Sequence, residues 1–290
     1  MSEAKKFDIN VEFHSDLDSL QLKKATYDQF AEIIYNLAGI DLPYSAKNEA
    51  LIRNRMVKVM RRRGIDKFES YLDIVKKAKH EDIQEFVSAM TTNLTSFYRE
   101  SDHFVFMTQK LPEFVQKCPE VRIWCAAAST GQEPYTIAIT SREAVPDNQI
   151  GRVRILATDI DLQVLKKGSQ GIYDEREMQG LSPQLRQKYF DKAVGKNGTE
   201  FYRSKDTLNR MLTFAQFNLM NERYEFKNKF QIVICRNVLI YFDEETTKKV
   251  VDRLVSCVEP GGYLILGHSE SGNVKHPQLK PLSKAIYQKV

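Results

Sequence analysis

After Thr95, short apolar segments alternate with segments of helical periodicity, and this alternation constrains the fold more than any other feature. Helical stretches such as Pro134–Ala144 and Glu244–Val258 fall between most of the apolar segments. Strands that alternate with helices are joined by right-handed crossovers, which give a parallel sheet covered on both faces. We therefore predict a doubly wound α/β domain. Its strands are expected at Val121–Ala127, Val153–Thr158, Leu212–Phe217, Phe230–Ile234 and Tyr263–Gly267.

One connection in this domain is much longer than the others. Between the helix expected at Asp161–Gly168 and the strand that begins at Leu212 lie roughly 40 residues, whereas connections in compact domains are about 2–6 residues long. The interval contains its own helical and strand-like segments, so we predict an inserted β subdomain at about residues 170–210. The alternating tail, Pro281–Val290, is expected to add a closing antiparallel strand.

The region before the α/β domain is helical and carries no strand pattern. Phe30, Ile33, Ile34 and Leu37 recur at helical spacing, and the pattern repeats over Ser45–Arg63. We predict an N-terminal arm over residues 1–24, a helical domain over 25–90 and the α/β domain over 91–290.

Composition limits the classes of protein that remain. Lys and Arg number 43 against 38 Asp and Glu, and a net charge of +5 allows an anionic partner without requiring one. No apolar run approaches the roughly 18–20 residues that span a bilayer, and the first residues lack the apolar core of a signal peptide. The four cysteines show no Cys-x-x-Cys spacing and the five histidines no metal-binding spacing. We expect a cytoplasmic protein without a metal ion.

Two segments at predicted strand ends carry the signs of a cofactor site. After the first strand, Gly131 stands alone, so the Gly-x-Gly-x-x-Gly loop that holds the pyrophosphate of NAD or FAD is absent. After the second strand come Asp159 and Asp161, where a carboxylate either binds ribose hydroxyls or caps a helix. One of the two can cap while the other binds. A ribose site without a pyrophosphate loop favours S-adenosylmethionine.

Polar residues also interrupt an apolar segment at Arg236 and Asn237, where the strand within Phe230–Phe242 is expected to end. Such residues face either a pocket or solvent, and we favour the pocket. Further along, Pro260-Gly261-Gly262 between a helix and a strand is typical of methyltransferases that use S-adenosylmethionine, although this turn alone is weakly specific.

Several longer segments resemble the CheR family of chemotaxis receptor glutamate O-methyltransferases. The resemblance implies a cytoplasmic enzyme that uses S-adenosylmethionine, releases S-adenosylhomocysteine and esterifies glutamates on the helical cytoplasmic region of methyl-accepting receptors. It also implies that the inserted subdomain can dock a receptor C-terminal peptide, as in some members. The matching segments are Thr91–Glu100, Trp124 with Ser129–Tyr135, Ala157–Asp161, Phe217–Leu219 and Cys235–Phe242.

The resemblance also implies roles for individual residues of this chain. Asp159 is expected to hold the ribose, and Glu133 to face the cationic part of the methionyl group. Gln132 stands where the family more often has Glu. As catalytic residues we predict Arg99 and Tyr241, which would orient the substrate carboxylate. The cofactor-binding residues that the family implies are Asn93, Thr95, Arg99, Glu133, Asp159, Asn218, Leu219, Arg236 and Asn237.

A run of basic residues lies on the predicted helix Ser45–Arg63. At about 100° per residue, Arg55, Lys58 and Arg62 share one stripe. A run of this kind is usually a solvated helix face, but it also suits an acidic helical surface or nucleic acid. Because receptor methylation helices are rich in Glu, the family implies an acidic receptor surface. The predicted receptor-binding residues are Arg53, Arg55, Lys58 and Arg62.

Two other functions compete with this prediction. A nucleic-acid methyltransferase acting on amino groups typically carries an Asn/Asp-Pro-Pro-Tyr-like element after the fourth strand, where this chain has Arg236-Asn237-Val238-Leu239. Methylation of a cytosine carbon needs a nucleophilic cysteine, usually after proline, and here only Cys118 adjoins a proline, which follows it. A non-catalytic adapter that binds S-adenosylmethionine is the second alternative. A methyl-transfer assay distinguishes it from an enzyme.

Overall fold

The structure is a computed structural model that describes residues 20–77, 80–195 and 197–290. The predicted arm at 1–24 therefore lies mostly outside the described residues. The described chain forms two compact units. The first runs to Asn36 and continues over Leu42–Met90, and the second comprises Leu37–Asp41 and Thr91–Val290. None of the helices in the described ranges is both long enough and apolar enough to cross a bilayer.

The first unit is entirely helical over its described residues. The hydroxyl of Ser45 accepts a hydrogen bond from the Asn48 amide and caps the second helix, which ends at Gly64 in the left-handed conformation. Phe30 stacks on Phe86 at a centroid distance of 5.9 Å, and both side chains are fully buried in the core. The helices are α1 (Lys24–Ala38), α2 (Ala46–Arg63), α3 (Phe68–Lys76) and α4 (His80–Met90).

The second unit is built on a seven-stranded sheet of order β6-β2-β1-β7-β8-β10-β9. The first five strands in this order are parallel, and β10 and β9 are antiparallel. The predicted doubly wound fold and its closing antiparallel strand are thus confirmed. The strands are β1 (Val121–Cys125), β2 (Val153–Asp159), β6 (Leu212–Gln216), β7 (Phe230–Cys235), β8 (Val258–Leu266), β9 (Leu279–Ser283) and β10 (Ile286–Lys289).

The central strands of this sheet are buried on both faces, and their successive side chains point to opposite faces. Ile123 and Ile234 share one hydrophobic cluster with α5 (Asp102–Lys117) and α6 (Gln132–Ala144). Trp124 and Val233, the neighbours of those residues in sequence, share the other cluster with α10 (Glu244–Cys257). The unbroken apolar runs of the strands follow from burial on both sides. Two further elements of this unit are α7 (Leu162–Gln170) and α9 (Asp206–Asn209).

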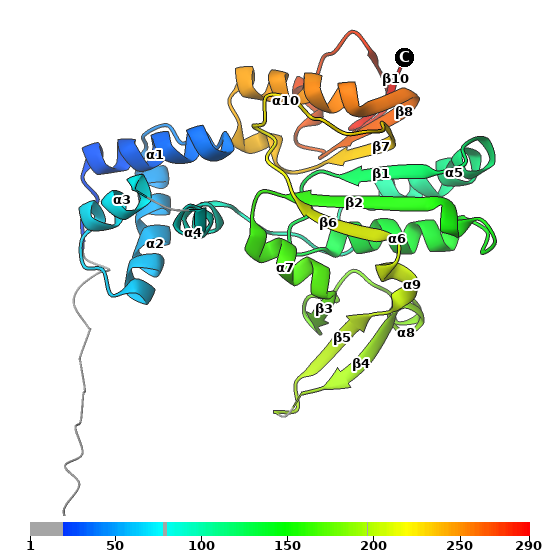
Figure 1. Cartoon of the computed structure of the whole chain (residues 1–290), viewed down its shortest axis with the longest axis horizontal. Coiled ribbons are helices and arrows are strands. Elements are labelled where there is room, and N and C mark those ends of the chain that lie inside the picture. The colour runs from blue at the N-terminus through cyan, green and yellow to red at the C-terminus, as the bar shows by residue number, and fades with distance from the viewer. Residues whose placement is uncertain (1–19, 78–79, 196) are drawn as a thin grey trace, which may run out of the picture. The chain divides into compact units, whose positions relative to one another are not determined.

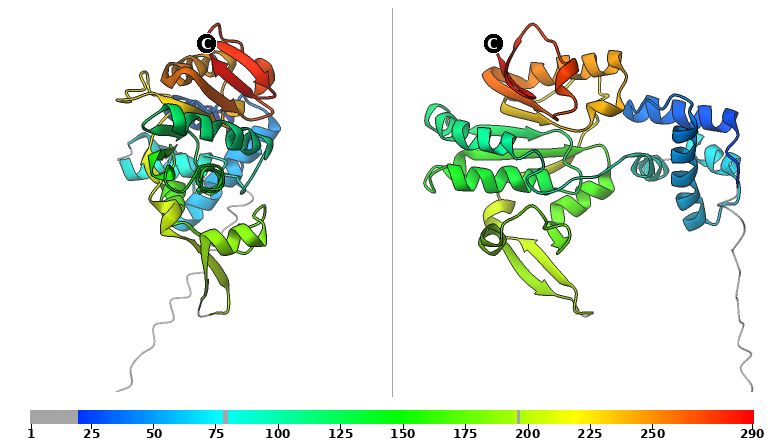
Figure 2. Two further views of the ribbon diagram at one scale, coloured as in Figure 1. Left: turned by 90° about the vertical axis from the view of Figure 1, so that its right-hand side faces the viewer. Right: turned by 180° about the vertical axis from the view of Figure 1, so that it is seen from behind.

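The long connection forms a separate three-stranded antiparallel sheet of order β3-β5-β4, which confirms the predicted β insertion. It lies at the end of the main sheet where β6 is the edge, opposite β9 and β10 (Figures 1 and 2). Its elements are β3 (Ile172–Asp174), α8 (Pro183–Tyr189), β4 (Phe190–Val194) and β5 (Glu200–Ser204).

Two features of the second unit differ from the expectations. The strand expected from Tyr263 already begins at Val258, and the register of its pairing with β7 shifts between Phe230 and Ile232. The glycines expected to form a turn therefore lie at an irregularity within β8, where Gly261 has φ 76°. Helix α5 was not predicted, and it carries Pro112 in its interior.

Candidate functional site

Most of the cofactor-binding residues predicted from the sequence lie at or just after the carboxyl ends of β1, β2, β6 and β7, whereas Asn93, Thr95 and Arg99 precede α5. The chain proceeds from β1 to β2 and β6 on one side and returns to β7 and β8 on the other, so β1 and β7 flank the point where strand order reverses. Ligands of open α/β sheets bind outside the carboxyl ends of the strands at such a point.

The turn after β1 is shaped by Gly131, whose φ is 98°. A Cβ at this position would lie 2.6 Å from the Tyr173 hydroxyl oxygen and 2.9 Å from the Gly168 Cα. The glycine is therefore required by close packing against α7 and the inserted sheet as well as by its backbone conformation. Ser129 in the same turn also has positive φ, at 47°.

Asp159, the last residue of β2, is a buried carboxylate held by backbone donors. Its Oδ2 accepts from the Ser129 amide at 2.8 Å, and its Oδ1 accepts from the Asp161 amide at 3.0 Å. Burial raises the pKa of Asp159 to about 6, against the lowering effect of these amides. A carboxylate has about four acceptor positions, so two bonds leave it able to accept from two hydroxyls. The two free acceptor positions fit the two hydroxyls of the ribose of an adenosyl group.

Asp161 has the other role that the sequence allowed. Its Oδ1 accepts from the Gln163 amide at 2.8 Å and caps α7. Its Oδ2 accepts from the Asn93 side-chain amide at 3.0 Å. The Asn93 carbonyl in turn accepts from the Ser129 hydroxyl at 3.0 Å. Asn93 thus connects the segment before α5 to the loops after β1 and β2.

Arg236, directly after β7, is the centre of a buried ion-pair network. Its guanidinium contacts Glu133 at 2.6 Å and Glu100 at 3.1 Å, and it donates to the Arg99 carbonyl. Only 4% of Arg236 is exposed. Burial alone would raise the pKa of Glu100, but the Arg236 charge and hydrogen bonds outweigh it, so this pKa is lowered. Glu133 also accepts from the Cys125 thiol at 3.2 Å.

Asn237 adopts a left-handed conformation with φ 57°, and two carboxylates hold it there. Its side-chain amide donates to Glu100 at 3.2 Å, and its backbone amide donates to Glu270 at 3.0 Å. Glu270 also accepts from the amides of Val238, Leu239 and Gly267. Burial raises the pKa of Glu270. The roles of Glu100 and Glu270 were not predicted, because Asn237 and Val238, to which they bind, are remote from them in the chain.

Two predicted cofactor residues follow β6. The Asn218 side chain donates to the Leu37 carbonyl at 2.7 Å and accepts from the Met220 amide at 2.9 Å. Leu219 is buried in the hydrophobic cluster beneath α10. Thr95, before α5, is half-buried.

Of the predicted catalytic residues, Arg99 lies in a turn in which both of its neighbours, Tyr98 and Glu100, have positive φ. Its guanidinium donates to the Leu94 carbonyl at 2.8 Å, so it does not depend on an ion pair for its position. Tyr241 ends the short helix η3 (Leu239–Tyr241) and is half-buried. Its carbonyl accepts from the Asp41 amide at 2.8 Å.

The predicted receptor-binding residues lie on α2 in the first unit. Lys58 and Arg62 are exposed, whereas Arg53 and Arg55 are half-buried. The Arg55 guanidinium donates to the Met90 carbonyl, and Arg62 lies 3.4 Å from Glu85. On the same helix, the apolar side chains of Ile52, Met56 and Val59 are buried.

Comparison with known proteins identifies both units. The CheR methyltransferase all-alpha domain matches residues 25–91, and the CheR methyltransferase SAM binding domain matches residues 93–287. A chemotaxis protein methyltransferase of Borreliella burgdorferi is 35% identical over 281 residues, which is 93% of this chain and 96% of that protein. One of Escherichia coli is 36% identical over 255 residues, 88% of this chain and 87% of that protein.

A solved structure of the N-methyltransferase NodS from Bradyrhizobium japonicum with S-adenosylhomocysteine is also similar. It covers 66% of this chain and 87% of its own, at 11% identity and a TM-score of 0.35.

Proposed function

The chain belongs to the CheR methyltransferase family, and on that premise we propose that it transfers a methyl group from S-adenosylmethionine to glutamate carboxylates of chemotaxis receptors. The observation that carries the proposal is the match of both units to that family, together with a buried Asp159 that retains acceptor capacity at the end of β2. The preferred substrate is the helical cytoplasmic part of a receptor.

In this proposal the residues after the strands hold the cofactor. Asp159 accepts hydrogen bonds from the ribose hydroxyls, and the segment with Asn218 and Leu219 lies beside the adenine. Glu133 and Arg236, which are already paired with each other, line the methionyl side and keep a defined geometry there. When bound, S-adenosylmethionine supplies a methyl group activated by a sulfonium charge.

The remaining chemistry needs little from the protein beyond positioning. A glutamate side chain has a pKa of about 4.3, so at pH 7 it is already a nucleophilic carboxylate and needs no general base. The reaction neutralises a cation and an anion, and water stabilises those separated charges better than it stabilises the transition state. Catalysis therefore comes from in-line orientation and from replacement of water by fixed protein groups. Arg99 and Tyr241 are the residues proposed to orient the glutamate.

We expect Arg99→Ala and Tyr241→Phe to lower turnover by about 10-fold or more, and to lower it more than they lower the affinity for S-adenosylhomocysteine. The reason is that both side chains are assigned to the substrate carboxylate. Turnover is measured with saturating receptor and affinity by calorimetry. Arg142→Ala is the matched control, since that arginine lies on α6 and pairs with Asp147. Wild-type turnover in either variant would remove that residue from the proposed role.

The exposed cations of α2 are expected to steer an acidic receptor surface. Lys58→Glu with Arg62→Glu should lower the methylation rate about 10-fold at low salt without changing cofactor affinity, and the wild-type rate should fall as salt increases. Arg55 is left unchanged because it donates to the Met90 carbonyl.

The control for this pair is Lys23→Glu with Lys24→Glu, which makes the same change in charge elsewhere on the first unit. If the α2 cations only form a solvated surface, both double variants should methylate at equal rates, and the wild-type rate should depend only weakly on salt. That result would assign receptor recognition to another surface, such as the inserted sheet.

The proposed function is tested by radiolabelled methyl transfer to receptor-containing membranes, followed by treatment with alkali. A glutamate methyl ester releases its label as methanol. Label that survives alkali, or that appears on added nucleic acid, would support a nucleic-acid methyltransferase instead. Cofactor binding without transfer to any receptor would identify an adapter.

A further inference from the structure

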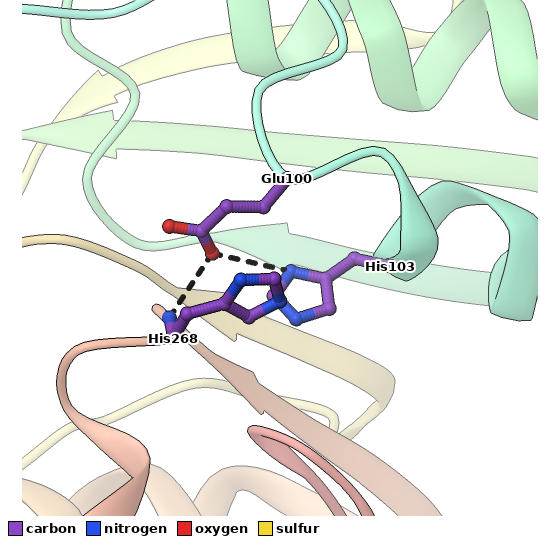
Figure 3. A group of neighbouring side chains, drawn as sticks. All are labelled: Glu100, His103 and His268. Carbon is purple, nitrogen blue, oxygen red and sulfur yellow. Dashed lines mark hydrogen bonds and ion pairs between the residues drawn. The ribbon is translucent and has the colours of Figure 1, made fainter.

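A cluster of metal-ligand side chains adjoins the Arg236 network. Glu100, His103 at the start of α5 and His268 after β8 each offer one ligand atom, and these atoms all lie within 4.8 Å of one another (Figure 3). His268 is remote in the chain from the other two residues. The absence of a metal-binding spacing in the sequence therefore does not bear on this cluster.

The buried imidazole of His103 has unpartnered nitrogens, and this observation points to a ligand. Its side chain is only 1% exposed, and neither ring nitrogen has a hydrogen-bond partner among the described residues. The nearest charged oxygen is that of Glu100, 3.7 Å from Nδ1, on the side of the ring where the cluster lies. A buried polar atom without a partner is costly, and native proteins rarely leave one. A coordinated ion would supply a partner for one of these two nitrogens.

His268 has the arrangement found in many metal sites. Its Nε2 lies 3.0 Å from a carboxylate oxygen of Asp102, which leaves Nδ1 as the coordinating atom. A carboxylate on the far nitrogen fixes the tautomer and the ring orientation of a ligating histidine. The His268 backbone amide also donates to Glu100 at 3.1 Å, so two of the ligand residues are already tied together.

The local charge suits a divalent cation. The Arg236 guanidinium faces Glu100 and Glu133, and Asp102 adds a third carboxylate beside His268. Three carboxylates and one guanidinium leave a net charge of −2, which a divalent ion cancels.

We propose that Glu100, His103 and His268 bind one Zn²⁺ ion, with Asp102 orienting His268 and water as the fourth ligand. Two imidazoles and one carboxylate with an open position suit zinc. Zinc–nitrogen distances of about 2.0–2.1 Å require the ligand atoms to close to within roughly 3.5 Å of one another. His268, whose side chain is 27% exposed, has room to make that adjustment.

Calorimetric titration of the full chain with Zn²⁺, after treatment with a chelator, tests the site. One equivalent should bind with a dissociation constant of about 1 μM or lower. His268→Ala should weaken this binding more than about 100-fold, and Asp102→Asn by about 10- to 100-fold. Glu100→Gln, which keeps the shape of the side chain, should weaken binding to a similar extent as His268→Ala.

Two control variants separate this site from other zinc ligands. His276→Ala removes a histidine that also lies beside a carboxylate, 3.5 Å from Asp252, and Cys118→Ser removes the one cysteine that is not buried. Both should bind Zn²⁺ as the wild type does. The proposal is overturned if the wild type binds no zinc in this range, if His268→Ala binds equally well, or if either control abolishes the binding.

Discussion

Asp159→Ala is expected to abolish measurable binding of S-adenosylhomocysteine while the protein remains folded. The carboxylate is assigned to two ribose hydroxyls, and a hydrogen bond to a charged group contributes about 1.5–3 kcal/mol. Loss of both bonds therefore weakens binding by at least about 100-fold. Calorimetry measures the affinity, and circular dichroism checks the fold.

Asp174→Ala is the matched control for this change. Asp174 ends β3 and accepts from the Glu177 amide at 2.9 Å, so it is also a carboxylate held by a backbone donor at a strand end. The control should bind as the wild type does. An unchanged affinity in folded Asp159→Ala would remove Asp159 from the cofactor site.

The raised pKa of Asp159 predicts how binding depends on pH. With a pKa of about 6, the group becomes protonated as pH falls below that value and loses acceptor capacity. The affinity should then fall by up to about tenfold per pH unit below pH 6. Asp159→Asn should bind more weakly and show no such dependence. The same slope in the asparagine variant would assign the titration to another group.

As pH falls, protonation of Asp159 should raise the free energy of unfolding, whereas it lowers cofactor affinity. The folded pKa of Asp159 is raised above its unfolded value of about 3.8. Ionised Asp159 therefore lowers the free energy of unfolding above pH 6, and this destabilisation disappears as pH falls from about 6 to about 4. The stability of the wild type relative to Asp159→Asn should rise over that interval while cofactor affinity falls.

The main sheet was predictable because its strands are buried on both faces. Ile123 and Trp124 pack into different clusters, so a run of consecutive apolar residues was required at this position. Helix α5, which precedes the first strand, was not predicted. Its interior proline is tolerated in a helix that buries Phe104 and Leu111 against the sheet.

The carboxylate acceptors of the site could be predicted from the sequence, but the ion-pair partners of Arg236 could not. That one of Asp159 and Asp161 caps a helix follows from local sequence. The pairing of Arg236 with Glu133 and Glu100 does not, because those carboxylates lie more than a hundred residues earlier, in the first turn of α6 and in the turn before α5. Charge pairing between distant segments depends on sheet order, which brings the ends of β1 and β7 together.

Arg236→Met is expected to lower the free energy of unfolding by about 3–5 kcal/mol, because removing one member of a buried ion pair leaves the other charges buried without compensation. The guanidinium also lies 5.6 Å from the centroid of the Phe104 ring, a contact that the variant loses. Lys192→Met is the control, since Lys192 and its partner Glu200 are both exposed and such surface pairs contribute about 0–1 kcal/mol. Denaturation at pH 7 measures both variants.

Acidification should distinguish loss of charge from loss of packing in Arg236→Met. In the wild type the lowered pKa of Glu100 contributes stability that is present above its unfolded pKa and is lost as pH falls through the folded value. The variant lacks that contribution, so its deficit should shrink on acidification below about pH 5. A deficit equal at pH 7 and pH 4 would indicate lost packing against Phe104. Adding Glu100→Gln and Glu133→Gln should then recover no stability, whereas the electrostatic explanation requires that it does.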